Sequence, residues 1–321
     1  MLTFVHIENF RSFVSAETKL RPFTLVLGAN GSGKSNFLKF FQMTSKPGQI
    51  GYDDWTTHMA HKTGDQWARF EFSTGSVVTT LIKGKGPAGF KPHWGNANLQ
   101  IYNPSPDAIS KPERPVRNPA VNGDGSGTCQ VLDALKTGDR EDLFNKIEEA
   151  FRTYVPEVEK LSLLTLADTK QIQVRERGLS KPLPATELSE GTRIILCLLT
   201  ILHQENPPPI ILLEDIDRGL HPRLFEYMAP LIRRIAEDHD INVIATTHNP
   251  YLVNYFRDDK EAVVLVEKEN GESKLIPLTD RINDLHDSNG DVEEMPLGDL
   301  WFSGLLGGVP KSINLRARAG A

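Results

Sequence analysis

The sequence has few of the features that mark secreted, membrane-spanning or coiled-coil proteins. Its two cysteines, Cys129 and Cys197, cannot make a disulfide framework and have no metal-ligand spacing, and we expect Cys197 to be a buried, inert thiol. The longest apolar run, around residues 194–202, is too short to cross a bilayer, and the N-terminus lacks the basic region of a signal peptide. No heptad repeat runs through any part of the middle region of the chain, which excludes a long coiled coil there. We therefore expect a cytoplasmic protein with no membrane partner.

An excess of positive charge is also missing. The formal net charge is -6, so there is no global attraction to nucleic acid, and DNA contact would need a local basic patch. The segment 83–130 is rich in Gly, Pro and Asn, and we predict an irregular insertion or loop there. A solvated loop is the ordinary role for such a segment, and contact with a DNA backbone is the alternative. Its cations and neighbouring aromatic residues are Lys83, Lys85, Lys91, Lys111, Arg114, Arg117, Trp94 and Tyr102.

The hydrophobic pattern predicts an α/β fold. The continuous apolar run 210–213 suits a central parallel strand, and segment 192–203 is apolar nearly all round, as expected of a buried helix. Segments with turn residues between apolar runs suggest antiparallel hairpins. The other predicted strands are 2–8, 24–27, 67–72, 77–82, 161–166, 171–175, 241–245, 262–267 and 274–278, and the other predicted helices begin near Asn36, Leu143 and Pro222.

The most specific motif is a glycine-rich loop between an apolar strand and a helix. Residues 28–35 read Gly-Ala-Asn-Gly-Ser-Gly-Lys-Ser, which is G-x-x-x-x-G-K-S in the strand–loop–helix setting that a phosphate loop needs. Its glycines let backbone N–H groups face inward and, with the helix N-terminus, form an anion site. We expect Lys34 to reach the β- and γ-phosphates and the Ser35 hydroxyl to ligate Mg²⁺. The sequence therefore predicts binding of a nucleoside triphosphate.

Two predicted strands end in polar residues. Glu214 and Asp215 follow the strand 210–213, and His248 follows the strand 241–245, at the edge where α/β sheets bind ligands. One carboxylate could hold Mg²⁺ while its neighbour acts as general base, and the histidine could donate to a γ-phosphate oxygen. The alternatives are a solvated strand end and a partly buried histidine.

A second helix N-terminus could also bind an anion. Ser189, Glu190 and Gly191 lie at the start of the buried helix, where Ser189 and nearby amides could contact phosphate. An ordinary N-cap is the alternative for Ser189 when it is considered alone.

The chain contains, in this order, the segments GANGSGKS, LSEGT, IILLED, GLHP and TTHNP. Together they resemble the motifs of an ABC-type ATPase head of the SMC, RecF and OLD-like branch. The resemblance covers most of the chain outside the segment 83–130. It implies a P-loop NTPase fold with a mixed, partly parallel core sheet, an antiparallel β subdomain and a small helical insertion. Residues 1–321 would form a single ABC-type ATPase domain, with an irregular and helical insertion at 83–160.

The resemblance also implies roles for individual residues, with ATP and Mg²⁺ as ligands. Asp215 would be the general base, Glu214 and Ser35 would hold Mg²⁺, and His248 would be the switch histidine. Ser189, Glu190 and Gly191 would contact a nucleotide held by the opposite subunit. The nucleotide-binding residues would be Asn30, Gly31, Gly33, Lys34, Ser35 and Asn36, with Arg11 of the opening Asn9–Phe13 stretch nearby, and the D-loop would be Gly219, Leu220 and His221.

Two positions depart from the family pattern. The acidic pair is Glu214-Asp215, where many ABC proteins have Asp-Glu and OLD-like proteins often have Glu-Glu. Because Asp is one methylene shorter, with about 1.5 Å less reach, we expect slow turnover. The metal-contacting residue of the Q-loop can be placed only within 58–62.

The two anion sites of one chain predict a symmetric homodimer that holds ATP between opposed heads and separates after hydrolysis. The resemblance implies a role in DNA repair or anti-phage defence. Too little chain follows His248 for a nuclease domain, so a nuclease-type effector would be a separate protein.

One alternative is a transporter-coupling ABC subunit, which the LHP, SEGT and FRSF motifs and the missing Q-loop glutamine disfavour. The other is a nucleotide-dependent scaffold with little hydrolysis.

Overall fold

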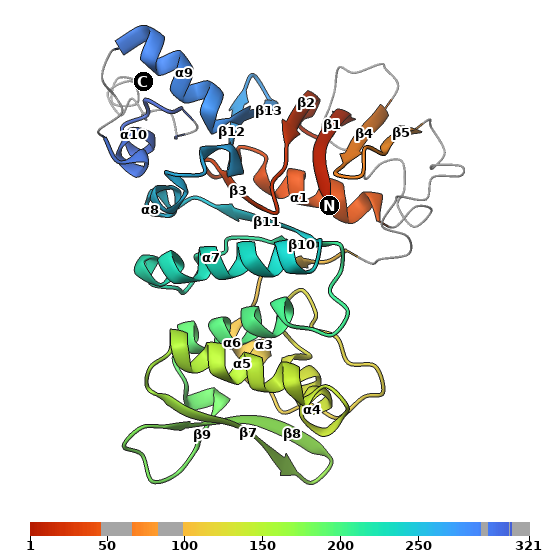
Figure 1. Ribbon diagram of the computed structural model, residues 1–321, viewed down its shortest axis with the longest axis vertical. Coiled ribbons are helices and arrows are strands. Elements are labelled where there is room, and N and C mark those ends of the chain that lie inside the picture. Colours follow the sequence, from red (N-terminus) through yellow and green to blue (C-terminus); the bar gives the residue numbers. More distant parts are fainter. Residues whose placement is uncertain (46–65, 83–98, 290–294, 308, 310–321) are drawn as a thin grey trace, which may run out of the picture.

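A ten-stranded mixed sheet forms the upper part of the molecule (Figure 1). The computed structural model describes residues 1–45, 66–82, 99–289, 295–307 and 309. The strand order is β5-β4-β1-β2-β13-β12-β3-β11-β10-β6. The bounds are β1 Leu2–Phe10, β2 Phe13–Lys19, β3 Phe23–Leu27, β4 Gln66–Phe72, β5 Val77–Ile82, β6 Ile101–Tyr102, β10 Ile210–Leu213, β11 Asn242–Thr247, β12 Val263–Glu269 and β13 Glu272–Pro277.

The sheet has a parallel half and an antiparallel half. Neighbours from β12 through β3, β11 and β10 to β6 are parallel, so their carboxyl ends meet at one edge of the sheet. β5, β4, β1 and β2 pair antiparallel, and β13 joins the halves by pairing parallel with β2 and antiparallel with β12. Only the parallel half presents strand ends that are suited to ligand binding.

The parallel strands are buried on both faces, and alternate residues belong to two separate cores. In β10, Ile211 and Leu213 face the larger core, whereas Ile210 and Leu212 face the smaller one. Since side chains alternate along a strand, a continuous apolar run is what such a two-faced position requires. The helix α1 (Lys34–Thr44) packs into the smaller core, where Phe37, Phe40 and Phe41 meet the antiparallel half of the sheet.

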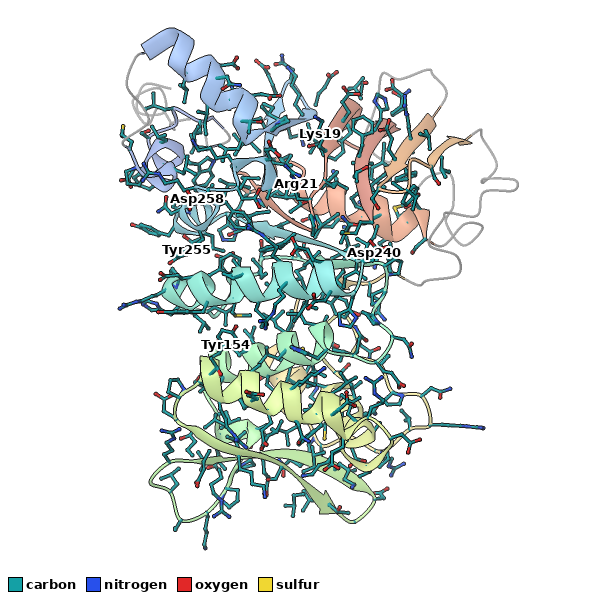
Figure 2. The ribbon with its side chains drawn as sticks, in the orientation of Figure 1. Lys19, Arg21, Tyr154, Asp240, Tyr255 and Asp258 are labelled. Atoms are coloured by element: carbon teal, nitrogen blue, oxygen red, sulfur yellow. The ribbon has the colours of Figure 1, made fainter. Side chains whose placement is uncertain are left out.

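The larger core continues into a lower layer of helices and a second sheet (Figure 1). α7 lies beneath the large sheet, and Figure 2 shows side chains filling the space between α7 and α5, where the Tyr154 hydroxyl donates to the Tyr227 carbonyl at 3.3 Å. The lower sheet has the order β7-β8-β9. The bounds are α3 Pro106–Ser110, α4 Thr128–Thr137, α5 Glu141–Tyr154, β7 Val158–Leu166, β8 Thr169–Glu176, β9 Leu183–Pro184, α6 Glu190–Leu202, α7 Pro222–Asp238, α8 Pro250–Val253, α9 Leu278–Asn289 and α10 Leu297–Phe302.

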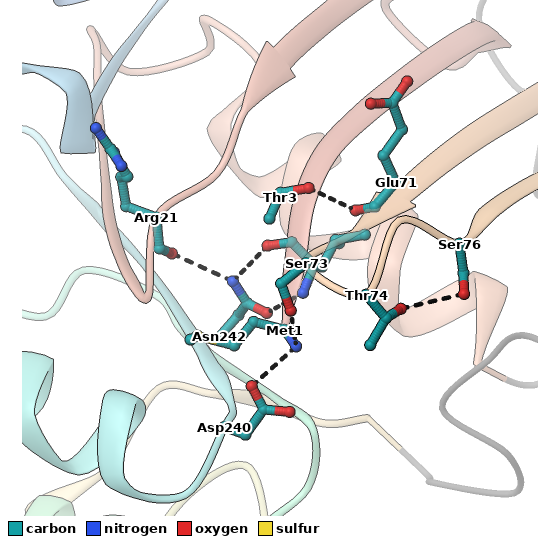
Figure 3. A network of polar contacts seen from close by, with 10 residues as sticks. Met1, Thr3, Arg21, Glu71, Ser73, Thr74, Ser76, Asp240 and Asn242 are labelled. Carbon is teal, nitrogen blue, oxygen red and sulfur yellow. Dashed lines mark hydrogen bonds and ion pairs between the residues drawn. The ribbon is translucent and has the colours of Figure 1, made fainter.

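The start of β1 is tied to the loop before β11 by a polar network (Figure 3). The amino group of Met1 lies 3.0 Å from Asp240 Oδ1. The buried Asn242 side chain accepts from the Leu2 N–H at 2.8 Å and donates to the carbonyls of Leu2 and Arg21 at 2.9 and 3.2 Å. These bonds hold the antiparallel half against the parallel half, although β1 and β11 are not neighbours in the sheet.

Most predicted elements are present with similar bounds, among them the hairpins β4–β5, β7–β8 and β12–β13, and Cys197 is buried as expected. Several features differ. The elements β2, β9, α8, α9 and α10 had not been predicted. The expectation of irregular chain over 83–130 is right only in part for residues 99–130, where β6, α3 and the start of α4 interrupt irregular chain, while 83–98 lie outside the described residues. β6 is too short to show a hydrophobic period, which is why the sequence did not indicate it. None of the described helices combines the length and the apolar character that a membrane span requires.

Candidate nucleotide-binding site

The glycine-rich loop connects the carboxyl end of β3 to α1. Gly33 is the residue before the helix, its φ is 121°, and no side chain among the described residues caps the helix. The first N–H groups of α1 are therefore left for an external acceptor, which is the arrangement that binds phosphate. A Cβ at Gly28 would lie 2.5 Å from the Val266 carbonyl oxygen of β12, so only glycine fits where the loop leaves β3. The loop and the helix start therefore offer backbone donors of the kind that bind an anionic group.

Lys34 lies folded against this loop. Its Nζ donates to the carbonyls of Gly28 and Ala29 at 2.8 and 3.0 Å, and the side chain is buried. Burial lowers the pKa of Lys34, and the negative charges of Asp215, Glu214 and Asp217 act in the opposite direction. The Lys34 ammonium group thus lies between the loop carbonyls and the turn after β10, residues 214–217, which we call the acidic turn. A phosphate would be a stronger partner for this ammonium group than a neutral carbonyl.

Ser35 and Glu214 bring two oxygen atoms together beside the loop. The Ser35 hydroxyl donates to Glu214 Oε1 at 2.5 Å. Mg²⁺ is held by few protein oxygens together with substrate phosphates, so a hydroxyl and a carboxylate at the mouth of a phosphate loop fit its chemistry. Among the described residues no group of three or more His, Cys, Asp or Glu could hold a metal ion by itself. The donor set therefore suits a metal ion that arrives with a triphosphate.

Asp215 occupies a turn that suits its short side chain. Its φ is 49°, in the left-handed region that Asp and Asn enter more readily than Glu. Its N–H donates to Thr246 Oγ1 at 3.0 Å, which ties the turn to the end of β11. Its Oδ1 lies 3.4 Å from His248 Nδ1, and the two side chains are 34% and 48% exposed. The carboxylate and the imidazole are therefore neighbours, and both are open to solvent.

A second tie joins the same two loops. The Thr247 hydroxyl donates to Asp217 Oδ1 at 2.6 Å and accepts from the Asn249 N–H at 3.0 Å. Thr246 and Thr247 are thus bonded to Asp215 and Asp217, respectively, and they directly precede His248 in the chain. Sequence reasoning assigned no role to Asp217 or to the two threonines, although their place at the strand ends was the available signal.

The second predicted anion site lies at the start of α6. Ser189 is the N-cap, and its Oγ accepts from the Thr192 N–H at 3.1 Å, so within one chain it makes the ordinary cap that was the alternative. Gly191 packs against the predicted D-loop, because a Cβ there would lie 2.8 Å from the Gly219 carbonyl oxygen.

The other predicted signature and D-loop residues lie near the starts of α6 and α7. Ser189, Glu190 and Gly219 are exposed or at the surface. His221 caps α7 by accepting from the Arg223 N–H at 3.2 Å, and Leu220 lies in the turn before it. The signature and D-loop segments are thus adjacent within one chain.

Arg11 lies in the β1–β2 turn, with φ of 49°. Its Nη1 donates to Asn36 Oδ1 at 3.3 Å, so the turn contacts the first turn of α1. Asn30 and Gly31 are exposed at the tip of the loop.

The predicted Q-loop segment, 58–62, lies outside the described residues. The cations considered for DNA contact are described only in part, because those at 83, 85 and 91 also lie outside. Among the described cations, Arg114 makes an ion pair of 2.7 Å with Asp168.

Two family models match separate segments of the chain. Residues 1–64 match a model described as "AAA ATPase domain", and residues 109–254 match one described as "AAA domain, putative AbiEii toxin, Type IV TA system". The first segment contains the phosphate loop, and the second contains Ser189, Glu214 and His248. A search of curated proteins found no match.

Solved structures of SMC head domains have a similar architecture. An SMC head bound to the C-winged helix domain of ScpA has a TM-score of 0.55 and 15% identity, and the match covers 86% of this chain and 96% of that one. The SMC head from Thermotoga maritima has a TM-score of 0.52 and 18% identity, with 86% and 98% covered. The fold is that of an SMC head.

A third SMC head, with an extended coiled coil and bound to the C-terminal domain of ScpA derived from Pyrococcus furiosus, has a TM-score of 0.50 and 15% identity, with 89% and 98% covered. The SMC-type fold and the two AAA matches together support an ATP-binding ATPase of the SMC/ABC-like branch, as the motifs had indicated. With this fold, the phosphate loop, the acidic turn and His248 follow β3, β10 and β11, and β11 lies between the other two strands in the sheet.

Proposed function

We propose that this SMC-type head hydrolyses ATP at the carboxyl edge of the parallel strands. The observation that carries the proposal is the convergence of an uncapped helix N-terminus, the Ser35–Glu214 pair and the Asp215–His248 pair at neighbouring strand ends. Lys34 would exchange the carbonyls of Gly28 and Ala29 for phosphate oxygens. Ser35 and Glu214 would hold Mg²⁺, which neutralises phosphate charge when it is bound.

Asp215 is the proposed general base. Its carboxylate would accept a proton from the attacking water while the bond from the water oxygen to the γ-phosphorus forms and the bond to the leaving ADP oxygen breaks. His248 would donate a hydrogen bond to a γ-phosphate oxygen and keep Asp215 in place from 3.4 Å away. Both side chains are partly exposed, so water can reach them.

We propose that two copies hold two nucleotides between them. The proposal rests on two helix N-termini in one chain, those of α1 and α6, of which α1 already carries the phosphate loop. A second copy is the simplest supplier of Ser189 and Gly191 to the far side of the triphosphate, and a two-fold pairing makes both sites equivalent. Loss of the γ-phosphate would remove these contacts and release the heads.

Sedimentation velocity with and without Mg-ATP tests this proposal. We expect Asp215→Asn to dimerise with ATP and stay dimeric, because binding is kept and hydrolysis is lost. Lys34→Ala should remain monomeric. Lys39→Ala is the matched control, since Lys39 is an exposed lysine on the same helix and should leave dimerisation unchanged. An oligomeric state that is the same with and without ATP in the wild-type protein would contradict the switch.

Phosphate release measured on the same preparations separates the ATPase from a scaffold that binds ATP with little hydrolysis. Turnover by the wild-type protein that is lost in Lys34→Ala supports the ATPase. Nucleotide binding and dimerisation without turnover would favour the scaffold. A transporter-coupling role would require the protein to be recovered with membranes, and no motif of the site favours it.

The biological setting we propose is DNA repair or anti-phage defence with a separately encoded, nuclease-type effector, and only the sequence resemblance supports it. Isolation of the Asp215→Asn dimer from the native cell, trapped with ATP, should recover a second chain in fixed stoichiometry with nuclease activity. Recovery of the dimer alone would count against an effector. DNA contact through the cations between 83 and 117 predicts filter binding that weakens as salt rises.

A further inference from the structure

Four polar groups form a connected row from the β1–β2 turn to the phosphate loop. Asn36 Nδ2 donates to Ser12 Oγ at 2.8 Å, Ser12 Oγ lies 2.8 Å from Ser273 Oγ, and Ser273 Oγ donates to the Ser32 carbonyl at 2.6 Å. Ser12, Ser32 and Ser273 are 8%, 4% and 2% exposed, so water does not replace these partners. Ser273 belongs to β13, far from the loop in sequence.

The donors in this row can run in only one direction. The Ser32 carbonyl only accepts, so the single hydroxyl proton of Ser273 is used there. The contact between the two serines then needs the proton of Ser12, and the Ser12 oxygen accepts from the Asn36 amide. Arg11 contacts the same row, because its Nη1 donates to Asn36 Oδ1 at 3.3 Å. Each donor has a defined acceptor, so loss of one hydroxyl breaks the row at a known point.

The last bond of the row sets the direction of one loop peptide. In a planar trans peptide the C=O and the next N–H point to opposite sides, so a Ser32 carbonyl held by Ser273 turns the Gly33 N–H away from Ser273. Among the described residues the Gly33 N–H has no hydrogen-bond acceptor. The φ of Gly33 is 121°, and a Cβ at that position would collide with the Ser273 side chain. Ser273 therefore sits directly against this peptide.

We propose that Ser273, supported by Ser12, is a positioning residue that keeps the Gly33 N–H directed toward a bound phosphate. The inference rests on the proposed nucleotide site and extends it to β13, which carries none of the sequence motifs. Without the Ser273 hydroxyl, the Ser32 carbonyl is buried without a donor, and the peptide is free to turn over. The anion site then loses one of its preorganised donors.

Titration with a fluorescent ATP analogue in the presence of Mg²⁺ tests the inference. Ser273→Ala should bind about tenfold more weakly, which corresponds to about 1.4 kcal/mol. Ser12→Ala should bind only about threefold more weakly, because Ser273 still donates to the carbonyl. The double variant should be no weaker than Ser273→Ala alone, since both substitutions break the same row. The KM for ATP should rise more in Ser273→Ala than in Ser12→Ala. In both variants kcat at saturating ATP should stay within about threefold of the wild-type value.

Ser45→Ala is the matched control. Ser45 is a buried serine at the other end of α1, where its hydroxyl donates to the Gln42 carbonyl at 2.7 Å. This variant should lose thermal stability and keep wild-type affinity. Wild-type affinity in Ser273→Ala, or an equal loss in Ser45→Ala, would overturn the inference. If Ser273→Ala does not fold, the affinity of Ser12→Ala is measured in its place, and wild-type affinity in that variant would overturn the inference. Failure of the wild-type protein to bind the analogue would instead refute the proposed function.

Discussion

Replacement of Asp215 by Asn should separate turnover from stability. Asn has the same shape as Asp and also tolerates the left-handed backbone, in which residue 215 has φ of 49°. The bond from the residue 215 N–H to Thr246 Oγ1, 3.0 Å long, does not involve the carboxylate and is retained. What is lost is the carboxylate charge in the 3.4 Å contact with His248, whose side chain is 48% exposed.

The two effects differ in size. A solvent-exposed ion pair contributes about 0–1 kcal/mol, so the free energy of unfolding should change by no more than that. A general base contributes about 10²- to 10⁴-fold in rate, which corresponds to about 2.7–5.4 kcal/mol in the activation barrier. We therefore expect a large loss of kcat in a protein whose thermal unfolding is nearly that of the wild type.

Steady-state phosphate release at saturating Mg-ATP, with thermal unfolding of the same samples, measures both effects. Asp217→Asn is the matched control, because an amide oxygen at residue 217 can still accept from the Thr247 hydroxyl. It should retain most of the activity. If Asp215→Asn binds ATP and keeps kcat within about threefold of the wild type, Asp215 is not the base.

The longer carboxylate gives the complementary result. Asp215→Glu should raise kcat, because the added methylene extends the reach of the base. It should also lower the free energy of unfolding by about 1 kcal/mol, since Glu is less tolerant than Asp of a positive φ. An unchanged kcat in a folded Asp215→Glu protein would count against the expectation of slow turnover from a short base.

Three further predictions concern the rest of the head. Gly191→Ala places a Cβ 2.8 Å from the Gly219 carbonyl oxygen, so the start of α6 must shift, and urea unfolding should show a loss of about 1–3 kcal/mol. Burial lowers the pKa of His203 below its ordinary 6.5, so the unfolded chain binds a proton at this histidine more readily than the folded chain does. The free energy of unfolding of the wild-type protein should therefore fall as pH drops below 6.5. In His203→Gln it should fall less steeply. Burial raises the pKa of Cys129 and Cys197 to about 12, so neither thiol should react with a disulfide reagent until denaturant is added.

The pattern of apolar residues predicted much of the fold because it reflects short-range requirements. The run Ile210–Leu213 must be buried on both faces, and the amphipathic period after residue 143 specifies one buried face of α5. In the β12–β13 turn, Asn270 and Gly271 both have positive φ, as a tight hairpin requires. β6 was missed because two residues carry no period, and it forms only because the edge of β10 is there to pair with it.

The phosphate loop was determined by the sequence alone, since a strand, a glycine-rich turn and a helix are consecutive and their amides converge locally. Only the tertiary structure decided what surrounds that loop. Ser273 reaches the Ser32 carbonyl across 241 residues, and Thr246 reaches the Asp215 N–H across 31. Parallel neighbours are joined by crossovers, not by tight turns, so which strand ends meet is set by packing of the whole sheet and leaves no local signal.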